Sequence, residues 1–277
     1  MADALASSLA AALRDRYAFE RELGGGGMSR VFLATETALD RRVVVKVLSP
    51  DLASGLSADR FRREIQLAAR LQHPHIVPLF SAGQADGLLY YTMPWISGES
   101  LRARLRREGE LPIPDALRIL RDVLDGLAYA HAQGVVHRDM KPENVLLTGT
   151  HAVVADFGVA KALRAAAEDT AFTTAGITLG TPAYMAPEQA AGDPNTDHRA
   201  DIYAVGVMAY EMLAGQPPFS ASTPQALLAA HVTRAPEPLS RRRASVPPPL
   251  EAVVMRCLEK RPADRWQRAE DLLHAFE

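Results

Sequence analysis

Short runs of β-branched and aromatic residues, separated by turns, dominate the first third of the chain. Because such runs are typical of strands in a partly buried sheet, they predict a small antiparallel sheet. A glycine run and a Leu39-Asp40 turn separate the first three runs. The expected strands cover residues 17–23, 31–35, 42–48, 77–81 and 88–93.

One helix is predicted between the third and fourth strands, over residues 58–71. Phe61, Ile65 and Ala68 recur there at helical spacing and would form its buried face. Pro74 would follow the end of the helix, because the residue before a proline disfavours helical backbone angles. A sheet with a single helix is therefore expected for one lobe of the molecule.

Helical periodicity replaces the strand pattern after the predicted sheet. Leucines recur every three or four positions over residues 117–127, and residues 202–213 form an apolar run. This segregation of strands from helices predicts an α+β fold with two lobes, a sheet lobe over about 17–96 and a larger, mainly helical lobe over about 97–277. The default ligand site of such a molecule is a cleft between the lobes.

Two segments lie outside the predicted core. In the N-terminal extension, residues 1–16, Leu5, Leu9 and Leu13 share one helical face through i, i+4 spacing, which indicates weak amphipathicity. A frayed terminus is the alternative, and we prefer it because terminal residues of domains are commonly poorly ordered. The proline-rich, basic segment 234–249 is interpreted as a surface loop.

Composition narrows the classes of partner. The formal net charge of −2 removes the electrostatic reason to expect nucleic-acid binding. The apolar run over residues 202–213 is well short of the roughly 20 residues that a spanning helix needs, so no membrane segment is expected within this chain. Cys257 is the only cysteine, which excludes an intramolecular disulfide and favours a reducing, cytoplasmic location.

The glycine run and a lysine in the third strand each have two interpretations. Glycines let backbone amides approach phosphate oxygens without a Cβ in the way, but such a run is about as often a flexible hairpin. Lys46 lies among four valines, where it needs a charged partner unless its amine reaches water. Glu64 on the following helix is the candidate partner, and a solvated glutamate is the alternative.

Acidic and amide side chains at two loops carry the strongest chemical signal. Residues 137–144 read His-Arg-Asp-Met-Lys-Pro-Glu-Asn, and residues 156–158 read Asp-Phe-Gly. Phosphoryl transfer needs a carboxylate that accepts the proton of the attacking hydroxyl, which suits Asp139. It also needs hard oxygen ligands for Mg²⁺, which suits Asn144 and Asp156. Each residue alone is consistent with a turn, but their ordered co-occurrence favours a shared function.

From about Tyr17 to its end, the chain resembles the eukaryotic-like serine/threonine protein kinases of bacteria in the order and spacing of these motifs. The resemblance implies the bilobal protein-kinase fold, with ATP as phosphoryl donor, Mg²⁺ (or Mn²⁺ in its place) as cofactor, and Ser/Thr residues of proteins as acceptors. Lys141, two residues after Asp139, and the segment 180–188 are typical of the serine/threonine class. A pseudokinase scaffold and a small-molecule phosphotransferase of the same fold are the alternatives.

The resemblance assigns one group of residues to ATP. Pro94 and Ile96 would pair with the adenine through a carbonyl and an amide. Two positions depart from the family pattern, since Ser29 stands where a third glycine is usual and Val44 stands where a small alanine is usual. The complete group is Leu23, Gly24, Gly25, Gly26, Gly27, Met28, Ser29, Val31, Val44, Lys46, Met93, Pro94, Ile96 and Leu146.

The resemblance also implies catalytic roles. Asp139 would be the catalytic base, and Lys141 would steady the transferred phosphate. Lys46 would hold the α- and β-phosphates, with Glu64 as its ion-pair partner. The metal ligands would be Asn144 and Asp156.

Further residues would support the larger lobe and its substrate. Glu188 would pair with Arg265, and Asp201 would anchor the catalytic loop. Thr181 would contact the docked substrate peptide.

Between Gly158 and Ala186 the resemblance implies an activation segment. We expect autophosphorylation there at Thr173 or Thr174, with Arg138 as the cation that binds the phosphate, and a merely polar loop is the alternative. Phosphorylation of one copy by another would need a transient homodimer. The candidate threonines are Thr170, Thr173, Thr174 and Thr178.

Two remaining features receive simpler interpretations. His73 and His75 flank a proline, and no metal-ligand set is evident around them in the sequence, so they are interpreted as loop residues. Members of the group often continue into a membrane anchor, so residues beyond Glu277 would be the means of tethering this domain to the inner face of a membrane.

Overall fold

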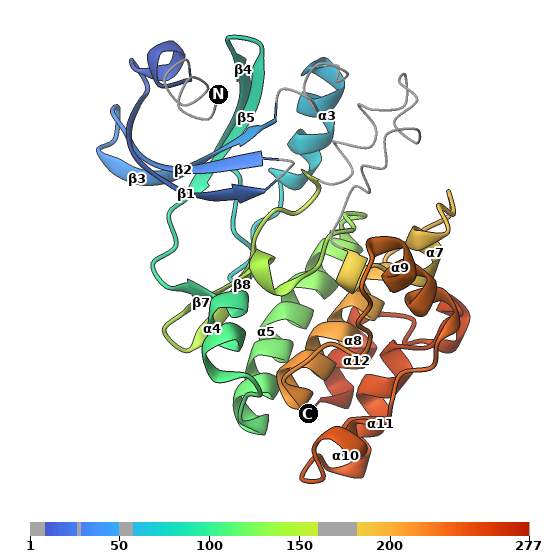
Figure 1. Cartoon of the computed structure of the whole chain (residues 1–277). Helices are drawn as coiled ribbons and strands as arrows, with labels where there is room; N and C mark the ends of the chain where they lie inside the picture. The colour runs from blue at the N-terminus through green and yellow to red at the C-terminus, as the bar shows by residue number, and fades with distance from the viewer. Residues whose placement is uncertain (1–8, 27–28, 50–57, 160–181, 277) are drawn as a thin grey trace. The chain divides into compact units, whose positions relative to one another are not determined.

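The computed structural model describes residues 9–26, 29–49, 58–159 and 182–276 (Figure 1). They form two compact units. Within the described ranges, the first unit takes residues up to 72 and 77–97, and the second takes 73–76 and the residues from 98 onward.

A five-stranded antiparallel sheet is the main element of the first unit (Figure 1). Its strand order is β1-β2-β3-β5-β4, so the first three strands form a meander and β5 pairs with β3. The predicted sheet is therefore confirmed. The strands are β1 (Tyr17–Gly26), β2 (Ser29–Glu36), β3 (Arg41–Leu48), β4 (Ser81–Ala85) and β5 (Leu88–Pro94).

The fourth strand lies further along the chain than the prediction of 77–81. Residues 77–80 have no strand structure, and β4 begins at Ser81. Pro78 has no backbone N–H to donate to a sheet, which explains why pairing starts only after it. The strand itself reads Ser-Ala-Gly-Gln-Ala, so it lacks the β-branched residues on which the prediction relied.

The helix of the first unit, α3 (Ala58–Ala68), uses the face that the sequence predicted. Phe61, Ile65 and Ala68 are all buried. The helix ends three residues before the predicted boundary at residue 71, which is the usual uncertainty of helix ends.

The frayed-terminus interpretation is wrong for residues 9–13. These residues are helical, and Leu9 and Leu13 are buried in a hydrophobic cluster with Tyr17 and the inner faces of β2, β3 and β5. Arg16 then donates a hydrogen bond from Nη1 to the hydroxyl of Tyr90 at 3.1 Å. The amphipathic spacing of the leucines was the correct signal, because it matches a face that covers the sheet.

Helices dominate the second unit, together with a small antiparallel sheet of order β6-β7-β8 (Figure 1). The predicted α+β class is confirmed. The strands are β6 (Glu99–Ser100), β7 (Val145–Thr148) and β8 (His151–Val154). The helices are α4 (Leu101–Glu108), α5 (Ile113–Ala132), α7 (Pro187–Ala190), α8 (Arg199–Ala214), α9 (Pro224–Thr233), α10 (Leu239–Arg242), α11 (Pro248–Cys257) and α12 (Ala269–Ala275), with 3₁₀ turns η1 (Pro142–Asn144), η3 (Pro182–Tyr184) and η4 (Pro262–Asp264).

The core of the second unit is α8, which contains the apolar run that the sequence analysis singled out. Every residue from Ala200 to Leu213 is buried, so the helix is covered on all sides by its neighbours. Among the described residues, no helix combines the length and the apolarity needed to cross a membrane. The segment 234–249, interpreted as a loop, instead contains α10 and the first two residues of α11.

Candidate active site

A buried carboxylate holds the backbone of the loop over residues 137–144. Asp201, in the first turn of α8, accepts hydrogen bonds from the backbone amides of His137 at 2.8 Å and Arg138 at 2.7 Å. His131 Nε2 lies 2.8 Å from the same carboxylate. Burial alone would raise the pKa of Asp201, but His131 and the amides lower it, so the group stays ionised. The predicted anchor residue therefore contacts the loop directly.

The backbone of this loop is held in an uncommon conformation. Arg138 has φ of 67°, in the left-handed region that non-glycine residues rarely adopt. Besides the bonds to Asp201, Gln189 Nε2 donates to the Arg138 carbonyl at 3.0 Å. The surrounding bonds offset the cost of this conformation, which is typical of loops with a chemical role.

His137 joins the loop to the residues that precede Phe157. Its Nε2 lies 2.8 Å from the Ala155 carbonyl, and its Nδ1 accepts the Asp139 amide at 3.2 Å. This pattern defines the tautomer with the proton on Nε2. The ring also packs edge-on against Phe157, with 4.8 Å between the centroids.

Asp139 and Lys141 form an ion pair at the surface of the loop. Lys141 Nζ lies 2.6 Å from Asp139 Oδ2, and both side chains are partly accessible. Asn144 Nδ2 donates to the Asp139 carbonyl at 2.8 Å. A carboxylate beside an ammonium group, on a rigid loop and reachable from solvent, can accept a proton from a bound hydroxyl.

A tight hairpin brings Asn144 and Asp156 to the same end of two strands. β7 and β8 pair so that Val145 faces Val154, and the Ala155 amide donates to the Asn144 carbonyl at 2.8 Å. Because Nδ2 of Asn144 is used within the loop, Oδ1 is the atom that this side chain offers to a cation. An amide oxygen and a carboxylate are hard ligands, so this donor set fits Mg²⁺.

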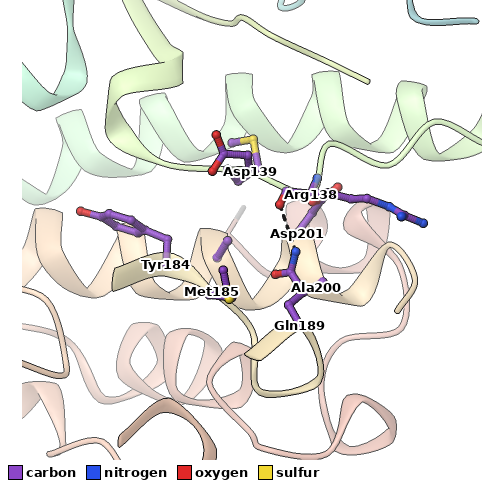
Figure 2. Close-up of a pocket in the computed structure, with 9 residues that line it drawn as sticks. Arg138, Asp139, Tyr184, Met185, Gln189, Ala200 and Asp201 are labelled. Carbon is purple, nitrogen blue, oxygen red and sulfur yellow. Dashed lines mark hydrogen bonds between the residues drawn. The ribbon is translucent and has the colours of Figure 1, made fainter. Parts of the chain in front are cut away.

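A pocket adjoins Asp139 within the second unit (Figure 2). The loop over residues 137–144 provides one wall, while Tyr184, Met185 and Gln189 provide the opposite wall. A hydroxyl group at this pocket would lie next to the Asp139 carboxylate. The pocket is lined by Arg138, Asp139, Met140, Tyr184, Met185, Gln189, Ala200, Asp201 and Ala204.

Beside this pocket lies a charged network that the sequence analysis did not predict. Arg102 at the start of α4 bonds Glu143 at 2.8 Å, Glu211 at 2.7 Å and the hydroxyl of Tyr184. Burial would lower the pKa of Arg102, but its bonds to Glu211 and the nearby negative charges raise it. Burial and the Glu211 charge also raise the pKa of Tyr184. The members lie on four separate segments, so no local sequence signal marks the network.

A second buried ion pair joins Glu188 and Arg265, as the resemblance implied. Both guanidinium Nη atoms donate to the two carboxylate oxygens at 2.7 Å, and Arg265 is completely buried. Arg265 also donates to the carbonyls of Glu259, Lys260 and Arg199. All five donors of the guanidinium are thereby used.

In the first unit, four of the residues assigned to ATP share one face of the sheet. Val31 and Lys46 are cross-strand partners, as are Val44 and Met93. Val43, Val45 and Val47 belong to the hydrophobic cluster on the other face, so strand alternation places Val44 and Lys46 opposite that cluster. Lys46 Nζ lies 6.0 Å from the centroid of the Tyr91 ring.

Gly24, Gly25 and Gly26 of the glycine run form the end of β1, where it pairs with the start of β2. Gly24, with φ of 145°, has a conformation that favours glycine, and a Cβ on Gly25 would lie 2.8 Å from the Ser29 carbonyl oxygen. Leu23 falls at a break in the strand register between Glu22 and Gly24. Glycine is therefore required for the shape of this hairpin, whichever of the two interpretations of the run holds.

The remaining residues assigned to ATP are divided between the units. Pro94 ends β5 opposite Val43, and Ile96 follows it in the first unit. Leu146 belongs to β7 of the second unit and pairs with Val153. Gly26 pairs with Ser29 in the hairpin.

Several predicted site residues lie outside the described part of the structure. They are Gly27, Met28, Thr170, Thr173, Thr174, Thr178 and Thr181. Glu64 lies in α3, but its side chain is also outside the described part.

Comparisons with known proteins agree with this geometry. The family model of the protein kinase domain matches residues 17–276. The chain is 41% identical over 266 residues to serine/threonine-protein kinase PknB of Mycobacterium leprae, covering 94% of this chain and 42% of that protein. It is 41% identical over 264 residues to serine/threonine-protein kinase pkn3 of Myxococcus xanthus, covering 92% of this chain and 48% of that protein.

The chain thus spans less than half the length of these curated relatives. Its family uses ATP with a divalent metal ion and acts on protein substrates. With a family model that covers nearly all of its length, the chain belongs to the protein kinase domain family, as the resemblance implied.

Proposed function

We propose that this chain is a serine/threonine protein kinase that transfers the γ-phosphoryl group of ATP to hydroxyl groups of protein substrates. The observation that carries the proposal is the Asp139–Lys141 pair, 2.6 Å apart on a loop that Asp201 fixes and beside a pocket. A pseudokinase would keep the fold without needing this accessible carboxylate. The names of the two relatives, both serine/threonine-protein kinases, support the same activity.

Asp139 acts in this proposal as the base that orients the substrate hydroxyl and accepts its proton. The Lys141 ammonium contacts the Asp139 carboxylate, so its positive charge lies where the phosphoryl group is transferred. In this position Lys141 neutralises the negative charge of that group during transfer. Asn144 and Asp156 hold Mg²⁺, which would offset the negative charge of the ATP phosphates when bound.

Residues of the first unit bind the nucleotide in this proposal. Lys46, with Glu64 as partner, holds the phosphates, while the glycine hairpin covers them and Pro94 and Ile96 meet the adenine. Support comes from the sheet face that Lys46 shares with Val31, Val44 and Met93. ATP dependence also fits the cytoplasmic location predicted from the sequence. The proposed kinase domain covers residues 17–277.

Regulation by phosphorylation is part of the proposal. One copy would phosphorylate Thr173 or Thr174 of another within a transient homodimer, and Arg138 would bind the product. Arg138 supports this role because its guanidinium is part-buried beside the pocket and contacts the Thr196 carbonyl at 3.5 Å. Phosphopeptide mass spectrometry after incubation with ATP tests it, since unmodified threonines at 170, 173, 174 and 178 would contradict it.

Transfer of labelled phosphate from ATP to a basic protein tests the activity. We expect Asp139→Asn to lower the rate by roughly 10²–10⁴-fold, because the carboxylate base is lost while the side chain keeps its size. Asp40→Asn is the matched control, since Asp40 lies in an exposed turn and its φ of 46° is tolerated by asparagine. Absence of transfer by the unaltered chain with Mg²⁺ or Mn²⁺ would favour the pseudokinase alternative.

A further inference from the structure

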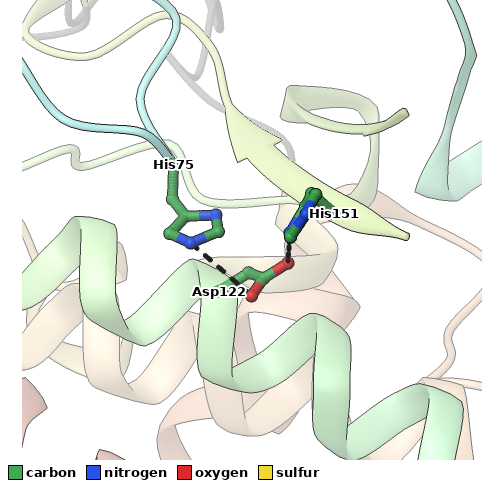
Figure 3. Close-up of side chains that lie close together, drawn as sticks. All are labelled: His75, Asp122 and His151. Carbon is green, nitrogen blue, oxygen red and sulfur yellow. Dashed lines mark ion pairs between the residues drawn. The ribbon is translucent and has the colours of Figure 1, made fainter. Parts of the chain in front are cut away.

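Three potential metal ligands from different segments of the second unit point toward one another (Figure 3). His75 lies in the segment 73–76, Asp122 lies on α5, and His151 begins β8. One ligand atom from each residue can be chosen so that all three lie within 4.8 Å of one another. None of the three residues has a role in the proposed phosphoryl transfer.

The spacing of these atoms is close to that of a filled site. His75 Nε2 lies 3.6 Å from Asp122 Oδ1, and His151 Nδ1 lies 3.9 Å from Asp122 Oδ2. Two ligands of a tetrahedral ion with bonds of about 2.0 Å are about 3.3 Å apart. Small side-chain rotations therefore suffice to bring the atoms around one ion, and the exposed ring of His151 is free to make most of that adjustment.

Ala152 of β8 orients two of the three ligands. Its carbonyl lies 2.8 Å from His75 Nδ1, and its amide donates to Asp122 Oδ2 at 2.7 Å. A carbonyl only accepts, so the proton of His75 is on Nδ1 and Nε2 is directed at the carboxylate. A histidine whose second ring nitrogen donates to a backbone carbonyl has the arrangement that is usual for metal-bound histidines.

Two carboxylates lie near His75 Nε2, on the side where a cation would bind. Asp122 Oδ1 lies 3.6 Å away and Asp125 Oδ2 lies 4.0 Å away, so an unprotonated nitrogen would face two carboxylates. Asp125 Oδ2 is also 3.5 Å from His73 Nε2, whereas Asp122 contacts both His75 and His151. A divalent ion satisfies both imidazoles and the carboxylate at once.

We propose that His75, Asp122 and His151 bind a divalent transition-metal ion, with Zn²⁺ as the best match. Two imidazole nitrogens and one carboxylate suit Zn²⁺ better than Mg²⁺ or Ca²⁺, which prefer oxygen ligands. Asp125 or a water molecule takes the fourth position, since the Asp125 carboxylate borders the cluster and is half exposed.

The ion would join the segment 73–76, α5 and β8 of the second unit. The Val154 amide already donates to the His75 carbonyl at 2.9 Å, so β8 and the segment 73–76 are in contact. β8 leads within two residues to Asp156. The role of the ion is therefore to stabilise this part of the fold rather than to take part in phosphoryl transfer.

Calorimetric titration with ZnCl₂ tests the proposal, with Mg²⁺ in millimolar excess so that the predicted magnesium ligands do not compete for Zn²⁺. We expect one Zn²⁺ per chain, and we expect His151→Ala and Asp122→Asn each to weaken binding by at least about ten-fold. Asparagine at 122 retains an oxygen that can accept the Ala152 amide. His274→Ala is the matched control, since His274 is exposed on α12 and outside the cluster. Unchanged affinity in both cluster variants, or no binding at 100-fold excess over the protein, would overturn the site.

Thermal unfolding gives a readout that is independent of kinase activity. Saturating Zn²⁺ should raise the Tm of the unaltered chain by about 4 °C or more, and a chelator should reverse the rise. The His151→Ala chain should show no such rise, whereas the His274→Ala chain should respond like the unaltered one. An equal rise in the His151→Ala chain would place the ion elsewhere, and no rise in the unaltered chain would overturn the site.

Discussion

At the scale of single residues, His231 on α9 is the clearest source of acid sensitivity. It is completely buried, and its Nδ1 is bonded to the hydroxyl of Tyr203 at 2.9 Å. Burial, together with the nearby Lys260 ammonium, lowers its pKa to about 4. The native imidazole therefore stays neutral at pH values where an exposed histidine is largely protonated.

We predict that the second unit loses stability as the pH falls from 6.5 towards 4. In this range the unfolded chain binds a proton at His231 and the native chain does not, so acid favours unfolding, by up to about 3 kcal/mol. The contribution is fully present above pH 6.5. Urea unfolding at pH 7, 5.5 and 4.5 measures it.

His231→Gln should flatten this pH dependence, whatever its effect on stability at neutral pH. His274→Gln is the control, since His274 is exposed and its replacement should leave the slope unchanged. Equal slopes for the unaltered and His231→Gln chains would contradict the prediction.

At the scale of elements, the packing of α8 against α11 depends on one glycine. A Cβ at Gly206 would lie 2.4 Å from the Cβ of Cys257, much closer than two non-bonded carbon atoms can approach. Glycine inside a helix usually lowers its stability by up to about 1 kcal/mol relative to alanine, so the close contact between helices must outweigh that loss.

Gly206→Ala should therefore destabilise the protein by about 1–3 kcal/mol, although the same change stabilises most helices. Gly126→Ala in α5 is the comparison, because its new Cβ would meet the His75 carbonyl oxygen at 3.1 Å and needs only a small adjustment. Denaturant unfolding of both variants measures the difference. A smaller loss for Gly206→Ala than for Gly126→Ala would show that α11 shifts away without cost.

The sequence predicted best the elements whose apolar residues follow a clear pattern along the chain. Phe61, Ile65 and Ala68 marked the buried face of α3, and the apolar run of α8 marked a helix that is buried all round. β4 was misplaced because its pairing depends on its neighbour rather than on its own residues. The ring of Tyr90 in β5 lies against Gly83, where a Cβ would come within 3.0–3.1 Å of the ring and its hydroxyl, so the ring would have to move.

At the scale of the whole molecule, residues far apart in sequence are joined by buried charges. The Glu188–Arg265 pair spans 77 positions and connects α7 to the segment between η4 and α12. Because both charges are out of water, neither is stable there without the other.

Arg265→Met should cost about 3–5 kcal/mol, since it leaves the buried Glu188 carboxylate and three carbonyl groups without their donors. Arg268→Met is the matched control, because the Arg268 ion pair with Asp271 is exposed and should contribute less than about 1 kcal/mol. Chemical denaturation measures both. A loss below 1 kcal/mol for Arg265→Met would mean that water enters and solvates the carboxylate.

The candidate site was only partly predictable from the sequence. The residues over 137–144 and 156–158 were found because their chemistry is contiguous in the chain and their order matches a known family. The bonds of Arg102 to Glu143 and Glu211, and the meeting of His75 with His151, depend on how distant segments pack. No periodicity or spacing encodes such meetings, so only coordinates could reveal them.

The two amide bonds to Asp201 have a consequence for each turnover. The chain around His137 and Arg138 is already ordered by a group inside the protein, before any nucleotide or peptide arrives. The conformational freedom of these residues is therefore given up once, during folding, rather than again in every reaction cycle. Binding energy from an incoming substrate then remains for aligning the substrate itself.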